Sequence, residues 1–168
     1  MRILGRRYRV KAVFPQFVNP LKPLYICNMQ HLDHIGIAVR ELGVSIPLFE
    51  KLLNSPCYKT EEVTGEKVRT AFFATGETKI ELLESTDPTG VIARFIEKKG
   101  EGLHHIAFEV PDIQLEMKRL AAEGFELLTD SPKPGADNKL VCFLHPKGTN
   151  GVLIEICQSV KQEWVNSK

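Results

Sequence analysis

The sequence has 168 residues, of which 43% are hydrophobic and 26% are charged, so it can bury a core as one domain or as two small fused halves. Its net charge of +1 is uneven, because residues 1–28 hold six basic residues and no acidic ones, which leaves 16 basic and 21 acidic residues in 29–168. This mildly acidic body argues against a nucleic-acid binder. No apolar run approaches the roughly 18 to 20 residues that span a membrane. The four cysteines are widely spaced and suit a reducing compartment.

Residues 1–28 contain Pro15, Pro20 and Pro23 and show no sustained hydrophobic period, so we expect a poorly ordered N-terminal extension outside the functional domain. Two explanations for it stay open. A basic segment without acids is typical of a mitochondrial presequence, although such segments are usually rich in serine and this one has none. We favour an upstream start codon, with Met29 as the functional first residue. The first explanation predicts the mitochondrial matrix, and the second predicts a cytoplasmic protein.

The first half of the body reads as strand, helix, strand, strand, strand, followed by a second helix. Short alternating runs bounded by turn residues predict the strands, and apolar residues three and four apart predict the helices. The expected strands are residues 32–39, 58–63, 67–74 and 79–84, and the expected helices are residues 44–53 and 91–99. In the first helix we expect an apolar stripe of Val44, Ile46, Leu48, Phe49, Leu52 and Leu53.

After a linker at 98–102, the second half repeats this order. The expected strands are residues 104–110, 125–128, 140–144 and 152–157, with a long loop at 129–138 and a turn at 145–151. The expected helix is 113–123, capped by Asp112, with Leu115, Met117, Leu120 and Ala121 facing inward. Such a repeat predicts an α+β fold in which two βαβββ modules in tandem pair into an eight-stranded cleft. We expect one domain at 29–158, with modules at 29–99 and 100–158 and a tail at 159–168.

Each half begins with a strand that carries a histidine on its small or polar face. Read with period two, His34, Gly36 and Ala38 share one face of the first strand. His105 and Ala107 occupy the matching face 71 residues later. A strand that packs one face on a helix and opens the other onto a cavity has this pattern. The repeat therefore predicts one histidine from each half in a shared cleft.

The last strand of each half holds an isolated acid between aliphatic residues, Glu81 in the first half and Glu155 in the second. A single histidine in a strand is more often a hydrogen-bonded structural residue, and a single glutamate can face solvent at a sheet edge. A matched pair is harder to explain by packing, because a buried unpaired carboxylate is costly. Imidazole and carboxylate ligands suit first-row divalent ions. The sequence thus predicts a metal site made of His34, Glu81, His105 and Glu155.

The remaining histidines are less informative. His104 and His105 are adjacent and point to opposite faces of a strand, so only one can be a ligand. The repeat selects His105 and matches His104 with Asp33, which favours a structural role or a role behind the ligands. For His145, which precedes Pro146 and Lys147, a turn at a strand end is favoured over contact with an anionic ligand.

Several segments together resemble the vicinal oxygen chelate superfamily, and within it the methylmalonyl-CoA epimerases. They are Leu32-Asp33-His34-Ile35-Gly36-Ile37-Ala38-Val39, Lys79-Ile80-Glu81-Leu82-Leu83, Gly102-Leu103-His104-His105-Ile106-Ala107, Phe143-Leu144-His145-Pro146-Lys147 and Gly151-Val152-Leu153-Ile154-Glu155. The resemblance covers about residues 30–158, and the His-His-Ile-Ala and Leu-His-Pro-Lys runs are its most specific parts. Gly-rich phosphate loops, G-x-S-x-G elbows and H-E-x-x-H helices are absent from the sequence, so serine hydrolysis and zincin chemistry have no support.

The resemblance implies an isomerase of propionate metabolism that acts on a CoA thioester and binds one divalent ion. Cobalt is the ion expected first, with manganese, nickel, zinc or magnesium as further options. Inversion of C2 requires removal of a proton between a thioester and a carboxylate and its return to the other face, through an enolate that the metal stabilises. The resemblance also implies a glutamate as acid and base. We expect Glu155 first in this role and Glu81 second. It further implies a homodimer.

The chain departs from the family pattern at two positions. Some members have glutamine where Glu81 stands, and a carboxylate there alters the charge of the site. Some members carry a further, non-ligand glutamate on the strand that here contains Thr70, and a threonine cannot act as that base. The alternatives that stay open are a glyoxalase-like isomerase or lyase on the same scaffold and a metal-free ligand-sequestering protein. An iron dioxygenase fits less well, because two histidines and one carboxylate would leave Glu81 without a role.

Overall fold

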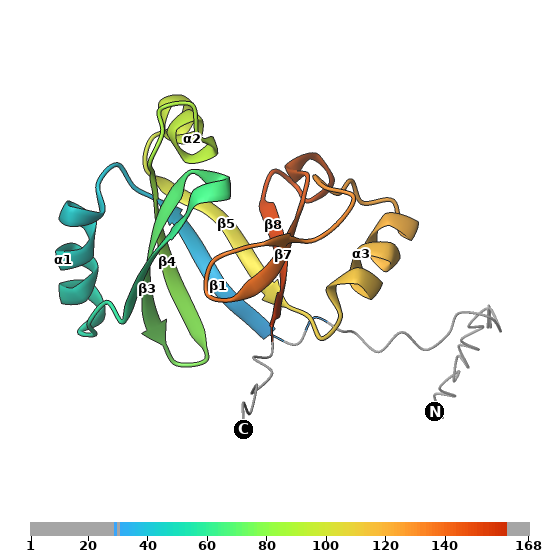
Figure 1. Ribbon diagram of the computed structural model, residues 1–168, viewed down its shortest axis with the longest axis horizontal. Helices are drawn as coiled ribbons and strands as arrows, with labels where there is room; N and C mark the ends of the chain where they lie inside the picture. The colour runs from blue at the N-terminus through green and yellow to red at the C-terminus, as the bar shows by residue number, and fades with distance from the viewer. Residues whose placement is uncertain (1–28, 30, 161–168) are drawn as a thin grey trace, which may run out of the picture.

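The computed structural model describes residue 29 and residues 31–160, so the expected extension at 1–28 and most of the expected tail lie outside the described residues. An eight-stranded sheet, strongly curled, runs through the molecule in the order β2-β3-β4-β1-β5-β8-β7-β6 (Figure 1). The strands are β1 (His31–Ala38), β2 (Lys59–Val63), β3 (Val68–Thr75), β4 (Thr78–Ser85), β5 (Gly102–Glu109), β6 (Lys133–Pro134), β7 (Lys139–Leu144) and β8 (Leu153–Ser159). The α+β fold predicted from the repeat is confirmed.

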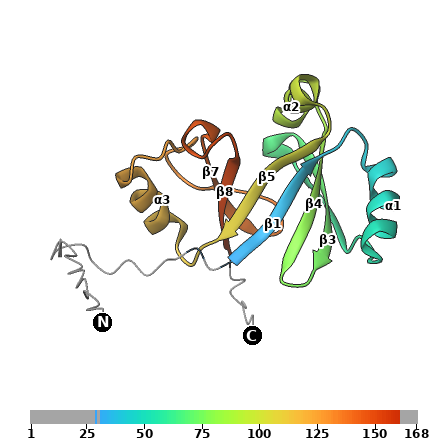
Figure 2. The same cartoon turned by 180° about the vertical axis from the view of Figure 1, so that it is seen from behind.

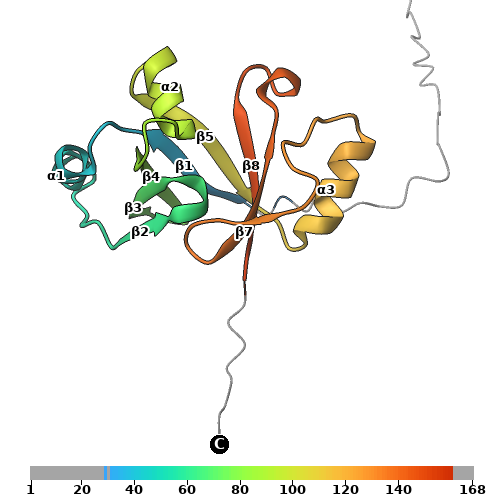
Figure 3. The same cartoon turned by 45° about the horizontal axis from the view of Figure 1, so that its top comes forward.

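The two halves of the sheet are built in the same way and join along β1 and β5. Within the first half β1 is parallel to β4, and within the second half β5 is parallel to β8. Between the halves, β1 and β5 are antiparallel, as expected for two like units related by an approximate twofold axis. Figure 3 shows the halves rising on either side of this junction. Strands from both halves therefore border one central cleft.

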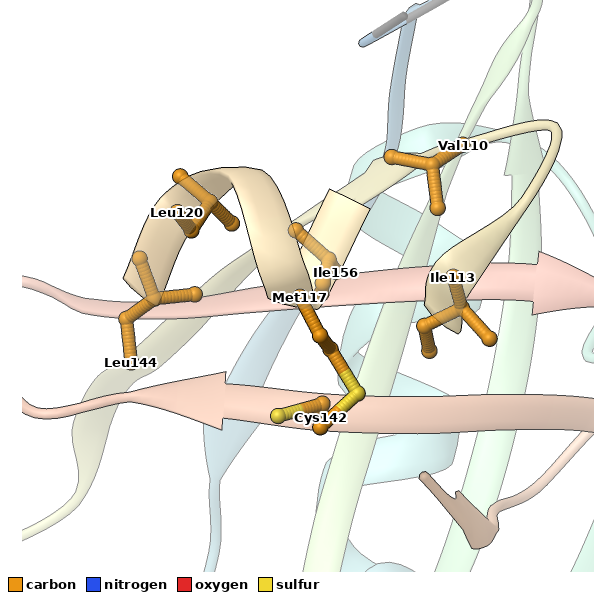
Figure 4. Close-up of a cluster of buried hydrophobic side chains, with 7 residues drawn as sticks. All are labelled: Val110, Ile113, Met117, Leu120, Cys142, Leu144 and Ile156. Atoms are coloured by element: carbon orange, nitrogen blue, oxygen red, sulfur yellow. The ribbon is translucent and has the colours of Figure 1, made fainter. Parts of the chain in front are cut away.

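A helix covers the outer strands of each half. In the first half α1 (Leu42–Leu53) packs on β3 and β4, and in the second half α3 (Ile113–Ala122) packs on β7 and β8. Figure 4 shows the core beneath α3, formed by Val110, Ile113, Met117, Leu120, Cys142, Leu144 and Ile156. The third helix, α2 (Val91–Lys99), follows β4, and its Ile92 and Ile96 are buried. Figure 2 shows that none of the three helices within residues 31–160 covers β1 and β5 from behind.

Two helix faces differ from the expectation. In α1 the residues that pack on the sheet include Ile46, Phe49 and Leu53. The other half of the expected stripe is between 60% and 70% exposed and consists of Val44, Leu48 and Leu52. The apolar residues of this helix lie on two faces, and only one face meets the strands.

In α3 the buried face contains Ile113, Met117 and Leu120, whereas Leu115 and Ala121 are exposed. Position 116 on this face is a buried glutamate, whose carboxylate accepts hydrogen bonds from the Arg119 side chain. The expected helix cap is confirmed, because the Asp112 side chain accepts a hydrogen bond from the Leu115 backbone.

The strand expected at 125–128 is also wrong. This segment forms only an isolated bridge between Leu127 and Leu144, and Phe125 and Leu127 pack against the core under α3. The fourth strand of the second half is instead β6, which lies in the segment expected to be a loop and pairs with β7. Among residues 31–160, no helix is long and apolar enough to cross a bilayer.

Candidate metal centre

The four side chains predicted as metal ligands lie on four adjacent strands at the centre of the sheet. His34 is on β1, Glu81 on β4, His105 on β5 and Glu155 on β8. Gly36 of β1 pairs with Glu81 on one side and with His105 on the other. Because a strand repeats its side-chain direction every second residue, this register turns all four side chains toward the same cleft.

The donor atoms of these residues converge. His34 Nε2 and His105 Nε2 are 3.0 Å apart. Glu81 Oε2 lies 3.3 Å from His34 Nε2 and 3.6 Å from His105 Nε2. Glu155 Oε2 is 3.4 Å from His105 Nε2, and Glu155 Oε1 is 3.9 Å from His34 Nε2. All four side chains are between 3% and 7% exposed. The repeat thus brings together all of the residues that it singled out.

This donor set fits a divalent ion. Two imidazole nitrogens and two carboxylates are the ligand types that first-row divalent ions take in proteins. Among the described residues, Glu155 Oε1 is the buried side-chain oxygen that has no hydrogen-bond partner, and buried polar atoms rarely lack one. A cation between the carboxylates and the imidazoles would satisfy this oxygen and balance the buried negative charge.

The four groups also change one another's protonation. Burial lowers the pKa of His34, but hydrogen bonds with Asp33 and Glu81 and the charge of Glu155 outweigh it and raise this pKa to about 10. Burial raises the pKa of Glu155 to about 8. Burial and the charge of His34 hold the pKa of His105 well below its usual value. At neutral pH, without a metal ion, His34 and Glu155 each carry a proton that an ion must displace.

The cleft above these residues has a volume of about 260 Å³ and mostly apolar walls. Two of its aromatic residues form a matched pair that the sequence analysis missed. Phe72 on β3 is the register partner of Glu81, and Phe143 on β7 is the register partner of Glu155. The ring of Phe143 packs edge-on against His105, with 5.5 Å between the centroids. Each module therefore places one phenylalanine beside its own carboxylate, in a position to hold a substrate above the donors.

Thr70 is fully buried and lines the same cleft. It is on β3 opposite Leu83, two residues along β4 from Glu81. Its hydroxyl donates to the Glu61 backbone oxygen over 3.4 Å. A hydroxyl in this position can orient a polar group but cannot act as a carboxylate base.

The other histidines have different surroundings. His104 Nδ1 lies 3.0 Å from His105 Nδ1, and burial lowers the pKa of His104 to about 4, so it is neutral at pH 7. His145 accepts a hydrogen bond from the Lys147 backbone at the start of a short 3₁₀ turn (Pro146–Gly148). Its geometry agrees with the turn that the sequence favoured. His31 is exposed at the beginning of β1.

Gly36 provides the space for the His105 ring. A Cβ atom at this position would lie 2.2 Å from His105 Cε1, so the Gly36→Ala substitution must displace the imidazole. We expect a loss of affinity for Co²⁺ of about 10-fold or more, measured by calorimetric titration. Gly43→Ala in α1 is the matched control, because its Cβ would meet no atom within 4 Å. Equal affinities of the two variants would show that the ring position does not matter for metal binding.

Comparison with known proteins shows the family to which this chain belongs. The sequence pattern of the glyoxalase/bleomycin resistance protein/dioxygenase superfamily matches residues 33–143. The chain belongs to this superfamily. Those residues contain three of the four donors of the candidate centre, all of β5 and all but the first two residues of β1. The vicinal oxygen chelate fold expected from the resemblance is therefore confirmed.

Several individual proteins are similar in sequence to this chain over most of its length. An uncharacterised protein of Bacillus subtilis, YqjC, is 38% identical over 77% of the chain and 93% of its own length. The ethylmalonyl-CoA/methylmalonyl-CoA epimerase of Cereibacter sphaeroides is 37% identical over 76% of the chain and 96% of its own length. A solved methylmalonyl-CoA epimerase in complex with methylmalonyl-CoA and NH4+ is 31% identical, with a TM-score of 0.75, and covers 79% of the chain and 96% of that protein. These similarities confirm the resemblance to the epimerases of this superfamily.

Proposed function

We propose that the chain is a metal-dependent epimerase that inverts C2 of methylmalonyl-CoA. The observation that carries the proposal is the convergence of His34, Glu81, His105 and Glu155 at the floor of one cleft. Relatives named as epimerases of this substrate class support the choice of a CoA thioester. The same donor set could serve other reactions of the superfamily, and the substrate therefore needs its own test.

Inversion at C2 needs a base close to the substrate and an environment that tolerates an enolate. A divalent ion held by the four side chains would attract the thioester and carboxylate oxygens of the substrate and stabilise the enolate charge. The apolar walls around Phe72 and Phe143 exclude water from the reacting carbon and so strengthen these electrostatic interactions. The remaining task for the protein is to move the proton.

Glu155 is our first choice for this proton transfer. Its carboxylate lies on the cleft floor, and one of its oxygens lacks a hydrogen-bond partner. Without a metal ion, burial raises its pKa to about 8; a bound cation would oppose this shift and keep the carboxylate ionised, so that it could accept the C2 proton. Glu81 is the second choice, because its carboxylate lies on the other side of the histidine pair. Thr70 is unsuitable for this role.

The test is an assay of epimerisation on protein that has been treated with a chelator and dialysed. We expect this protein to be inactive and added Co²⁺ to restore the conversion of one methylmalonyl-CoA epimer to the other. Activity that chelation leaves unchanged would refute metal dependence. Metal binding without epimerisation, together with turnover of thiol adducts, would favour the glyoxalase-like alternative. Ligand binding without turnover and without metal would favour a sequestering protein.

Cobalt as the preferred ion, the division into modules at 29–99 and 100–158 and a cytoplasmic location stay predictions. We also propose a homodimer. The rear face of β1 and β5, which α1, α2 and α3 leave uncovered (Figure 2), presents half-buried apolar side chains such as Ile35, Ile106 and Phe108. A second copy of the chain would bury this strip against the same strip, as in an isologous interface.

A further inference from the structure

A row of buried charged groups lies behind His34, on the side of the ring opposite the candidate ligands. His34 Nδ1 and Asp33 Oδ2 are 2.8 Å apart. Lys139 Nζ donates to Asp33 Oδ1 over 2.8 Å. The same ammonium donates to Glu109 Oε2 over 2.5 Å and to Ser159 Oγ over 3.1 Å. Asp33 and Lys139 are each 7% exposed, although aspartate and lysine are rarely buried this far.

This row of charged groups connects the two halves of the molecule. Asp33 is on β1, whereas Lys139 is on β7 and Glu109 ends β5. Asp33, His34 and Cys157 are also close enough together to suggest a second metal site. Lys139 already supplies a cation there, because its ammonium lies among Asp33, Glu109 and Ser159. Lys79 Nζ also lies 3.2 Å from Asp33 Oδ2, so two ammonium groups balance the carboxylates of Asp33 and Glu109.

We propose that Asp33 and Lys139 are positioning residues for the metal centre. Asp33 accepts the Nδ1 proton of His34, so that Nε2 is the nitrogen available to a metal ion once the ion displaces the proton there. Lys139 fixes the Asp33 carboxylate in the plane that this hydrogen bond requires. The inference rests on the proposed metal-dependent function, and it adds two residues that are not among the four proposed ligands.

The other half of the molecule supports this arrangement by contrast. The residue before His105 is His104, and its Nδ1 lies 3.0 Å from His105 Nδ1. Each ligand histidine is thus held by the residue that precedes it, through a carboxylate in one half and an imidazole in the other. A carboxylate that accepts from the ring raises the basicity of an imidazole ligand. His34 is accordingly the stronger of the two histidine ligands.

The test compares metal affinity in variants of the full chain. For Asp33→Asn and Lys139→Met we expect Co²⁺ to bind about 10 to 100 times more weakly than to the wild type. The visible absorption bands of bound Co²⁺, which report ligand strength and geometry, are expected to shift. Lys139→Arg retains a cation that can donate to Asp33, so this variant is expected to recover most of the affinity.

Lys59→Met is the matched control for Lys139→Met. Lys59 belongs to the outer part of the same charged region and forms ion pairs with Glu61 and Asp137, but not with Asp33. Its Co²⁺ affinity and spectrum should equal those of the wild type. The inference would be overturned if Lys139→Met and Lys59→Met bound Co²⁺ as tightly as each other. It would also be overturned if both variants lost Co²⁺ affinity and thermal stability to the same extent. Failure of the wild type to bind Co²⁺ would instead refute the proposed function.

Discussion

Replacement of Glu155 by glutamine is expected to slow the exchange of the C2 proton of methylmalonyl-CoA with solvent deuterium by about 10² to 10⁴-fold. Glutamine has nearly the same shape and can still present an oxygen to a metal ion, but it cannot take up a proton near neutral pH. Proton NMR in D₂O on Co²⁺-loaded protein measures this exchange directly.

Glu81→Gln is the comparison that separates the two carboxylates. Members of the family with glutamine at this position exist, so we expect this variant to lose less exchange activity than Glu155→Gln. Metal content must be measured in both, because a loss of Co²⁺ would also reduce exchange. Near-normal exchange in metal-replete Glu155→Gln would remove Glu155 from the base role. A large loss in Glu81→Gln alone would transfer that role to Glu81.

Between about pH 6.5 and 9 the metal-free protein is expected to become less stable as the pH rises. The pKa of His34 rises from 6.5 when unfolded to about 10 when folded, so its stabilising charge is complete below pH 6.5 and is lost toward pH 10. The pKa of Glu155 rises from 4.5 to about 8, so folding becomes less favourable from pH 4.5 to 8. In both cases the folded state holds more protons than the unfolded state, so both groups make the protein less stable as the pH rises.

Two further histidines titrate below this window, and Cys142 and Cys157, whose pKa values burial raises from 9.0, add a decline of the same sign only near its upper end. The pKa of His104 is lowered to about 4, and that of His105 is also lowered. Their contributions increase with pH up to about 6.5 and are constant above it. Thermal melts with a chelator should therefore give a midpoint that falls from pH 6.5 to 9. Glu155→Gln is expected to reduce this slope, mainly below pH 8. A midpoint independent of pH would contradict the protonation of His34.

A divalent ion should reverse this dependence. The ion displaces the protons of His34 and Glu155, so its stabilising effect is expected to increase as the pH rises. Calorimetric titrations with Co²⁺ at pH 7 in two buffers of different ionisation enthalpy should show the release of about two protons per ion.

The centre of the molecule could be predicted because the repeat marks it. His34 and His105, with Glu81 and Glu155, recur at matching places, and strand alternation alone turns them to one face. Phe72 and Phe143 belong to the same repeat, but an aromatic residue in a strand is typical of any core. Their relation to the glutamates depends on strand register. Lys139 is 106 residues from Asp33, and no local pattern links the two.

The errors in the fold have a common cause. Residues Phe125 and Leu127 are apolar enough for a strand, but they are half-buried against the α3 core and the segment forms only a single backbone bridge. The actual edge strand, β6, contains a lysine and a proline and gives no strand signal. The exposure of Leu48 in α1 shows the same limit. A pattern reveals apolar residues, but the neighbouring elements determine which of them are covered.

The antiparallel pairing of β1 and β5 also has a kinetic consequence. Each half of the chain supplies one histidine and one glutamate, so neither half alone offers more than two ligands. An ion bound by all four side chains would link the two halves across the junction, and separation of β1 from β5 would release it. The dissociation rate of the ion would then be at least the rate at which this junction opens, and separation of the two central strands is among the costliest openings of the sheet. Slow release would indicate that these two strands seldom part.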